Sequence, residues 1–131
     1  MTPEKLVEMA MSAMEGAYVP YSGYKVGAAL LCADGTVYTG CNIENAAFTP
    51  TVCAERTAFF KAISDGHREF SAIAVCGGKD GHIAGYFPPC GVCRQVMREF
   101  CKDDFLVHMA GAAGAIKTRT LAQLLPESFS L

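Results

Sequence analysis

Charged residues are scarce in this sequence, and basic clusters and long apolar runs are missing from it. Only 18% of the 131 residues are charged, and the net charge is −2. Because lysine and arginine form no patch, the sequence argues against binding to a nucleic acid or to an anionic membrane surface. No segment approaches the ~20 apolar residues that a membrane-spanning helix needs. A small, weakly charged substrate therefore fits the sequence better than a polymer does.

The sequence also shows no secretory leader, no internal repeat and no linker. Glu4, Lys5 and Glu8 interrupt the N-terminal segment, where a signal peptide would have an apolar core. We therefore predict one domain over residues 1–131, located in the reducing cytoplasm. Clustered cysteines in that compartment bind metals or react more often than they form disulfides, and this chain has seven cysteines.

Apolar residues make up 51% of the sequence. A chain of this length can build one hydrophobic core without disulfides, but it cannot hide so much apolar surface alone. We therefore expect a homo-oligomer. A compact monomer remains the alternative, because alanine raises the apolar count.

Hydrophobic periodicity and turn residues predict a layered α/β fold. Helices are expected from residue 3 to the residues before Gly16, and over 53–64, 90–101 and 121–125. Strands are expected over 24–31 and 37–41 as a hairpin, and over 70–76, 105–109 and 116–120. This alternation predicts a three-layer α/β/α sandwich around a mixed sheet of about five strands.

Two segments, Cys53-Ala54-Glu55 and Pro89-Cys90-Gly91-Val92-Cys93, carry the strongest chemical signal. Both lie at predicted helix starts, where the helix dipole stabilises the thiolate form that binds metal. Three thiolates leave one tetrahedral position of zinc open, which is typical of a catalytic site. We therefore predict one zinc ion per chain, held by Cys53, Cys90 and Cys93.

The other cysteines and histidines are not expected to bind this metal. They lack metal-ligand spacing to the three cysteines, so we interpret the cysteines as small apolar residues and the histidines as surface or strand residues. These residues are Cys32, Cys41, Cys76, Cys101, His67, His82 and His108.

Glu55 and Arg56 follow the first of these cysteines directly. Zinc lowers the pKa of a bound water to about 7. A neighbouring Glu55 can take a proton from that water and pass it to a ring nitrogen and then to a leaving amine. Alone, Glu55 would be an ordinary acid in the first turn of a helix. Arg56 can withdraw excess negative charge from the thiolates, although a surface salt bridge is an equally good interpretation.

These motifs closely resemble those of the cytidine deaminases, specifically the short class that forms homotetramers. A related pattern of metal-binding residues is found throughout the zinc deaminases. The likeness covers nearly the whole chain and includes Tyr21-Ser22, 26–30, 40–45, 53–58, 89–95 and 124–126. It implies zinc-dependent hydrolysis of cytidine and 2′-deoxycytidine to uridine and 2′-deoxyuridine, in pyrimidine salvage, by a cytoplasmic tetramer with shared active sites.

The resemblance also implies roles for residues outside the metal motifs. Asn42 and Glu44 would hydrogen-bond the sugar, and the backbone N–H of Ala54 would hold the pyrimidine carbonyl. Tyr24 would line the pocket, and Phe129 would reach the active site of a neighbouring subunit. Without the resemblance, Asn42 and Glu44 would be a polar turn and Phe129 a plug in its own core.

Two residues depart from the family pattern. Tyr24 stands where phenylalanine is frequent, and Phe48 stands where tyrosine is common. Neither affects the metal or the proton transfer. They leave the fine substrate preference and the details of the subunit boundary open.

Other activities remain as alternatives. Cys90 and Cys93 have the spacing of a thiol–disulfide oxidoreductase, although such a protein would leave Cys53 and Glu55 unexplained, and the chain has no tryptophan. A non-catalytic zinc module would need a fourth protein ligand. A deaminase of another aminopyrimidine would differ in the segment 42–45. Action on DNA or RNA would need a basic groove and aromatic stacking residues, which are not evident.

Overall fold

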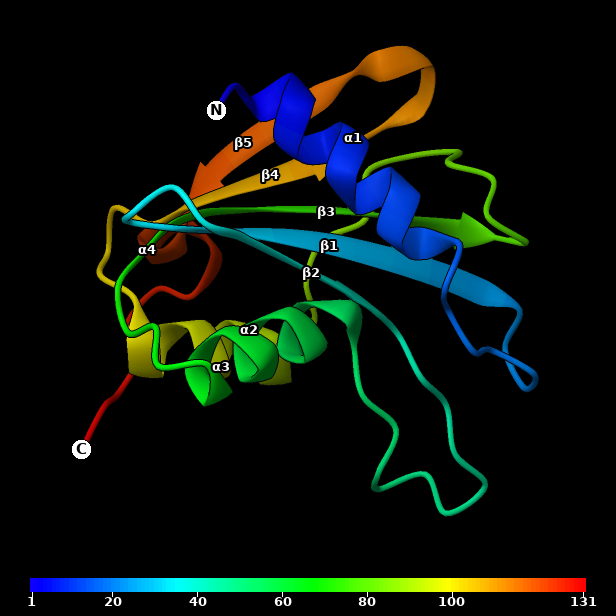
Figure 1. Ribbon diagram of the computed structural model, residues 1–131, viewed down its shortest axis with the longest axis horizontal. Helices are drawn as coiled ribbons and strands as arrows, with labels where there is room; N and C mark the ends of the chain where they lie inside the picture. The colour runs from blue at the N-terminus through cyan, green and yellow to red at the C-terminus, as the bar shows by residue number, and fades with distance from the viewer.

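A mixed five-stranded sheet with helices on both faces is the framework of the protein (Figure 1). The computed structural model describes all residues from 1 to 131. The strands are β1 (Tyr24–Cys32), β2 (Val37–Cys41), β3 (Phe70–Lys79), β4 (Leu106–Ala110) and β5 (Ile116–Thr120). Their spatial order is β2-β1-β3-β4-β5. Only β3 and β4 are parallel neighbours, because the other neighbouring pairs run antiparallel.

The helices divide between the two faces of the sheet, as Figure 1 shows. Helix α1 (Pro3–Met14) covers one face, and α2 (Ala54–Ser64) and α3 (Gly91–Phe100) cover the other. The short α4 (Leu121–Leu124) packs near α3, and a 3₁₀ turn, η1 (Ala112–Gly114), connects β4 to β5. The predicted three-layer sandwich around a mixed sheet is confirmed. None of the helices combines the length and the apolar character required to cross a bilayer.

Apolar side chains of β1 point alternately to the two faces of the sheet, which explains why helices cover both faces. Val26, Ala28 and Leu30 face the layer of α2 and α3, whereas Ala29 belongs to the core beneath α1. Phe59 of α2 is fully buried, and its ring centroid lies 5.2 Å from that of Phe70. Burial of such a side chain contributes about 1.5–3 kcal/mol, so it holds α2 firmly on the sheet.

Gly40 in β2 allows the N-terminal half of α2 to lie directly against the sheet. A side chain at this position would collide with the backbone of Ala54 and Ala58. The close approach therefore fixes where α2 begins, and with it the positions of Cys53 and Glu55.

Strand β3 continues to Lys79, whereas the sequence predicted its end at Cys76. Gly77 and Gly78 have a low strand propensity, but both pair with β1 in the antiparallel ladder. A side chain at Gly78 would collide with the backbone of His82, so the following loop folds back closely over the strand.

Candidate active site

Cys53 and Cys90 are the residues that cap the N-termini of α2 and α3. Both have extended backbone, with φ −74° and ψ 155° at Cys53 and φ −68° and ψ 167° at Cys90. The Sγ of Cys90 accepts a hydrogen bond from the backbone N–H of Cys93 at 3.5 Å. Two helix N-termini, each with a positive partial charge, therefore meet at one cluster of sulfur atoms.

The Sγ atoms of Cys53, Cys90 and Cys93 lie within 4.8 Å of one another, and no histidine or carboxylate joins the group. The Sγ atoms of Cys53 and Cys90 are 3.7 Å apart. Thiolates are preferred ligands of zinc, and three of them leave one tetrahedral position for a water or a substrate. The donor set therefore fits a zinc ion.

Arg56 and Cys93 both act on the Cys53 sulfur. Hydrogen bonding with Cys93 and with Arg56 lowers the pKa of the Cys53 thiol. The Nη2 of Arg56 donates to the Sγ of Cys53 at 3.3 Å. Within this chain Arg56 makes no salt bridge with a carboxylate. Its guanidinium can disperse the negative charge of the thiolate, as residues that hydrogen-bond to metal ligands commonly do.

Glu55 lies in the first turn of α2, and its side chain is only 3% exposed. Burial raises the pKa of Glu55 to about 7, and the negative charge of Cys53 acts in the same direction. A carboxyl group with this pKa exchanges protons readily near neutral pH, which suits a general acid–base catalyst.

A pocket of about 320 Å³ opens beside these groups. Its lining contains predicted site residues and apolar residues that the sequence did not single out: Tyr24, Val26, Asn42, Cys53, Glu55, Phe87, Pro88 and Cys90. Phe87 and Pro88 precede the second cysteine motif and form an apolar wall. The volume lies in the range of small-molecule sites.

Asn42 and Glu44 hold the segment from Tyr21 to Val26, of which Tyr24 and Val26 line the pocket. Asn42 accepts from the backbone N–H of Val26 at 2.9 Å and donates to the carbonyl of Tyr24 at 2.8 Å. Glu44 accepts from the backbone N–H groups of Tyr21 and Ser22 and from the Ser22 hydroxyl. The two polar side chains therefore hold the segment that leads into β1.

Phe129 lies apart from the pocket of its own chain. Its side chain is 67% exposed, and its carbonyl accepts a hydrogen bond from Gln95 at 3.2 Å. It is therefore not a plug in its own hydrophobic core, which was the alternative interpretation of this residue.

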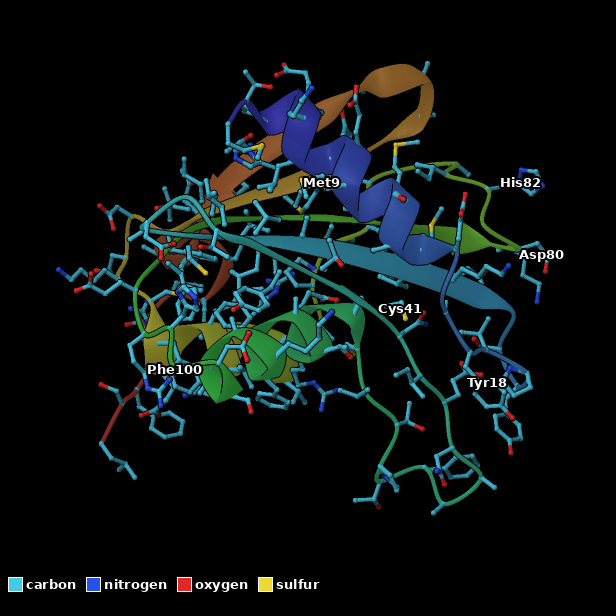
Figure 2. The ribbon with its side chains drawn as sticks, viewed as in Figure 1. Met9, Tyr18, Cys41, Asp80, His82 and Phe100 are labelled. Carbon is cyan, nitrogen blue, oxygen red and sulfur yellow. The ribbon has the colours of Figure 1, made fainter.

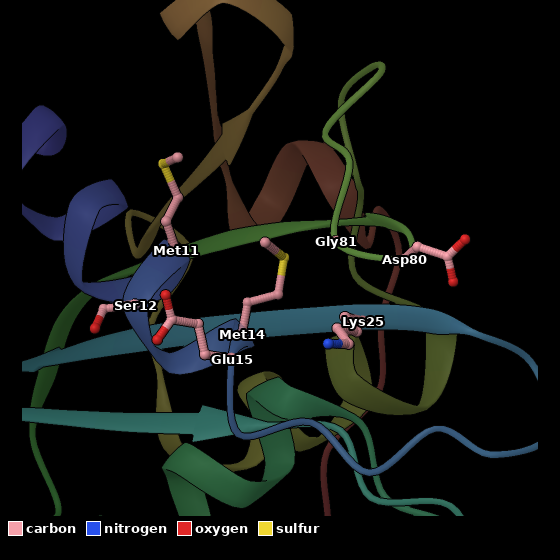
Figure 3. A pocket seen from close by; sticks show the side chains of 7 residues that line it. All are labelled: Met11, Ser12, Met14, Glu15, Lys25, Asp80 and Gly81. Atoms are coloured by element: carbon pink, nitrogen blue, oxygen red, sulfur yellow. The ribbon is translucent and has the colours of Figure 1, made fainter.

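A second hollow, of about 410 Å³, lies on the other face of the sheet beside the C-terminal end of α1 (Figure 3). Its lining includes Met11, Met14, Glu15, Lys25 and Asp80. It contains none of the predicted site residues and no group of metal-binding side chains.

Comparison with known proteins decides the family of the chain. Residues 1–109 match the family model of the cytidine and deoxycytidylate deaminase zinc-binding region. The chain belongs to this deaminase family. A cytidine deaminase of Sporosarcina psychrophila is 53% identical over 130 residues, which cover 99% of this chain and 93% of that protein. One of Halalkalibacterium halodurans is 49% identical, with coverage of 99% and 96%.

Solved structures of the deaminase family have the same fold. The crystal structure of cytidine deaminase from Burkholderia pseudomallei superimposes with a TM-score of 0.91 at 46% identity, and the match covers 98% of this chain and 100% of that chain. The predicted resemblance to cytidine deaminases is confirmed. The oxidoreductase interpretation explains only the Cys90–Cys93 pair and leaves Cys53 and Glu55 unexplained, whereas the zinc-binding region of this family covers all four residues.

Proposed function

We propose that this protein hydrolyses cytidine and 2′-deoxycytidine to uridine and 2′-deoxyuridine with release of ammonia. One zinc ion per chain would be held by Cys53, Cys90 and Cys93. The observation that carries the proposal is the position of Glu55, a buried carboxyl group in the same pocket as a cluster of three cysteines. We also interpret residues 1–131 as a single deaminase domain.

A zinc ion bound here supplies Lewis acidity, which makes water a nucleophile near neutral pH. Glu55 takes one proton from the attacking water and delivers it to N3 of the pyrimidine as the new C4–O bond forms. It then transfers the second water proton to the amino group at C4. The C4–N bond breaks, ammonia leaves with the second water proton, and the first water proton stays on N3 of the uracil ring.

Arg56 keeps the ligand cluster from becoming too electron-rich. Three thiolates on a divalent cation leave one excess negative charge, which would weaken its Lewis acidity. The hydrogen bond from Arg56 to Cys53 withdraws part of that charge. Arg56 is therefore a positioning and charge-balancing residue that does not touch the substrate.

The pocket supplies contacts for each part of a nucleoside. The backbone N–H of Ala54 is in the first turn of α2, where it has no intrahelical acceptor, so it is free to donate to the pyrimidine carbonyl. Tyr24 and Phe87 offer aromatic surface to the base. Asn42, which lines the pocket, and Glu44, two residues further on, would bind the sugar. The segment 42–45 resembles that of the cytidine enzymes, which favours cytidine over other aminopyrimidines as the substrate.

A homotetramer with shared active sites is part of the proposal. Large apolar side chains remain exposed along α2, α3 and the adjoining segments, namely Ile43, Phe48, Phe60, Val92 and Phe129. The loop between β2 and α2 and the C-terminal tail both project from the body of the subunit (Figure 1). Phe129 on the tail would complete the pocket of a neighbouring subunit. We place the enzyme in the cytoplasm, in pyrimidine salvage.

Substitution Glu55→Gln tests the proton transfer directly. The amide keeps the size of the side chain but cannot accept the proton from water, so ammonia release from cytidine should fall by roughly 10²–10⁴-fold. Zinc content and the thermal unfolding midpoint should stay close to those of the wild type. Glu8→Gln, an exposed position on α1, is the matched control. Near-normal turnover by Glu55→Gln would disprove the role of Glu55.

A further inference from the structure

A second group of metal-binding side chains lies at the opposite end of α2 from the candidate active site. Cys32 ends β1, Asp34 lies in the turn between β1 and β2, and His67 follows α2. Figure 1 shows this turn and the segment after α2 at the same end of the sheet. Because α2 has 11 residues and Cys53 caps its other end, the two groups are separated by about 16 Å along the helix.

We propose that Cys32, Asp34 and His67 form a second metal site, which binds a divalent transition-metal ion such as zinc. Their ligand atoms all lie within 4.8 Å of one another. The Nδ1 of His67 is 3.7 Å from Oδ2 of Asp34. Donors bound to one tetrahedral zinc ion are about 3.5 Å apart, given the usual bond lengths, so only small side-chain movements are needed.

The chemistry of the three donors suits a borderline transition metal. A thiolate and an imidazole favour zinc over calcium or magnesium, which prefer oxygen ligands. One thiolate, one carboxylate and a neutral imidazole together carry two negative charges, which balance a divalent cation. Cys32 is buried, whereas the exposed fraction of the side chain is 60% for Asp34 and 24% for His67, so an ion would enter from the side of Asp34 and His67.

Local structure already holds Asp34 and Cys32 in place. The Oδ1 of Asp34 accepts a hydrogen bond from the backbone N–H of Thr36 at 3.0 Å, which leaves Oδ2 directed to His67. Cys32 is anchored by backbone hydrogen bonds with Thr36 and Gly35 across the turn. A metal would therefore meet two donors whose backbone is already ordered, which lowers the entropic cost of binding.

His67 is positioned by the end of α2. Gly66 adopts a left-handed conformation with φ +99°, and the backbone N–H of His67 then bonds to the carbonyl of Ala62. This is a Schellman motif, which fixes the direction of the chain after the helix. The ring of Tyr38 packs edge-on against His67 with centroids 5.3 Å apart, and the Tyr38 hydroxyl donates to Asp65. The contact with Tyr38 thus restrains the imidazole ring of His67 in addition to the fixed backbone after α2.

Cobalt(II) is the probe for this site, because cobalt–thiolate bonds absorb in the near ultraviolet. Zinc-loaded protein is titrated with CoCl₂, and the absorbance that follows saturation of the second site is compared between variants. Substitutions Asp34→Asn and His67→Ala are at the surface, and asparagine can keep the turn hydrogen bond. Each should weaken cobalt binding roughly tenfold or more. Cys32→Ser should abolish the thiolate band of this second site and leave only the band from cobalt that exchanges into the site at Cys53.

His82→Ala and Asp80→Asn are matched controls, since both residues are exposed near the other end of the sheet (Figure 2). They should bind cobalt as the wild type does. Cobalt that exchanges into the site at Cys53 would contribute the same absorbance in all these proteins. This contribution therefore cancels when the variants are compared. The proposal is overturned if the wild type shows no thiolate band beyond the one that Cys32→Ser shows, or if that additional band persists at unchanged affinity in Asp34→Asn and His67→Ala. Cytidine turnover, measured on the same samples, reports separately on the proposed function.

Discussion

The Sγ atoms of Cys53 and Cys90 lie 3.7 Å apart, although the two residues are 37 positions apart in the sequence. Each caps its own helix, and both helices lie on the same face of the sheet. The cluster of cysteines is therefore a product of the tertiary fold, built where two positively polarised helix ends converge. Loss of any one sulfur should empty it.

Substitution Cys90→Ala should reduce bound zinc from about one ion per chain to near zero, because two thiolates cannot hold a tetrahedral metal tightly. Cys90 is exposed, so the polypeptide should still fold. Metal analysis after gel filtration measures the effect. Cys41→Ala, which lies outside the cluster, should keep its zinc. Retention of one zinc per chain by Cys90→Ala would show that the ligand set is wrong.

Substitution Arg56→Ala should slow deamination by roughly 10–100-fold while zinc content stays unchanged. The reason is the hydrogen bond from Arg56 to the Cys53 sulfur, whose removal leaves the ligand cluster more negative. Steady-state kinetics and metal analysis on the same preparation separate the two effects. Arg119→Ala on the exposed side of β5 is the control. Unchanged kcat in Arg56→Ala would contradict the charge-balancing role.

Substitution Phe129→Ala should lower kcat/KM for cytidine by about tenfold, equivalent to ~1.4 kcal/mol of transition-state stabilisation. Because Phe129 is largely exposed in its own chain, the free energy of unfolding of the subunit should change by less than about 0.5 kcal/mol. Leu131→Ala, also exposed on the tail, should behave as the wild type does. Equal kcat/KM in Phe129→Ala and wild type would exclude a contribution of Phe129 to a neighbouring pocket.

His108 makes the stability depend on pH. It is buried on β4, its Nδ1 is 2.8 Å from the Thr118 hydroxyl, and burial lowers its pKa from 6.5, although Glu4 opposes the shift. Below pH 6.5 the unfolded chain takes up a proton that the folded chain does not, so stability falls as the pH falls through the folded pKa. Denaturant unfolding of His108→Gln should show a weaker decline over this range. Identical pH dependence in both proteins would contradict the assignment to His108.

Much of the architecture could be predicted from local patterns in the sequence. The period of apolar residues placed α1 and α3, Asp65-Gly66 marked the end of α2, and the hairpin of β1 and β2 followed from its turn residues. The C-terminal end of β3 was missed, because the pairing of Gly77 and Gly78 with β1 is a tertiary interaction that outweighs their local propensity.

The candidate site was predictable only where its residues form compact motifs. The three cysteines, Glu55 and Arg56 lie in two short segments at helix starts. Phe87 and Pro88 could not be assigned from sequence, because an apolar pocket wall has the same composition as an ordinary loop that packs on a core. The proximity of Cys32, Asp34 and His67 depends on how α2 returns along the sheet, and no spacing in the sequence encodes it.

The central claim is most directly tested by the ultraviolet absorbance of cytidine incubated with the purified protein. Three samples are compared: zinc-loaded protein, protein stripped with a chelator, and stripped protein to which zinc has been restored. The account predicts conversion to the uridine spectrum in the first and third samples and none in the second. An unchanged cytidine spectrum with the zinc-loaded protein, or full conversion after removal of the metal, would contradict it.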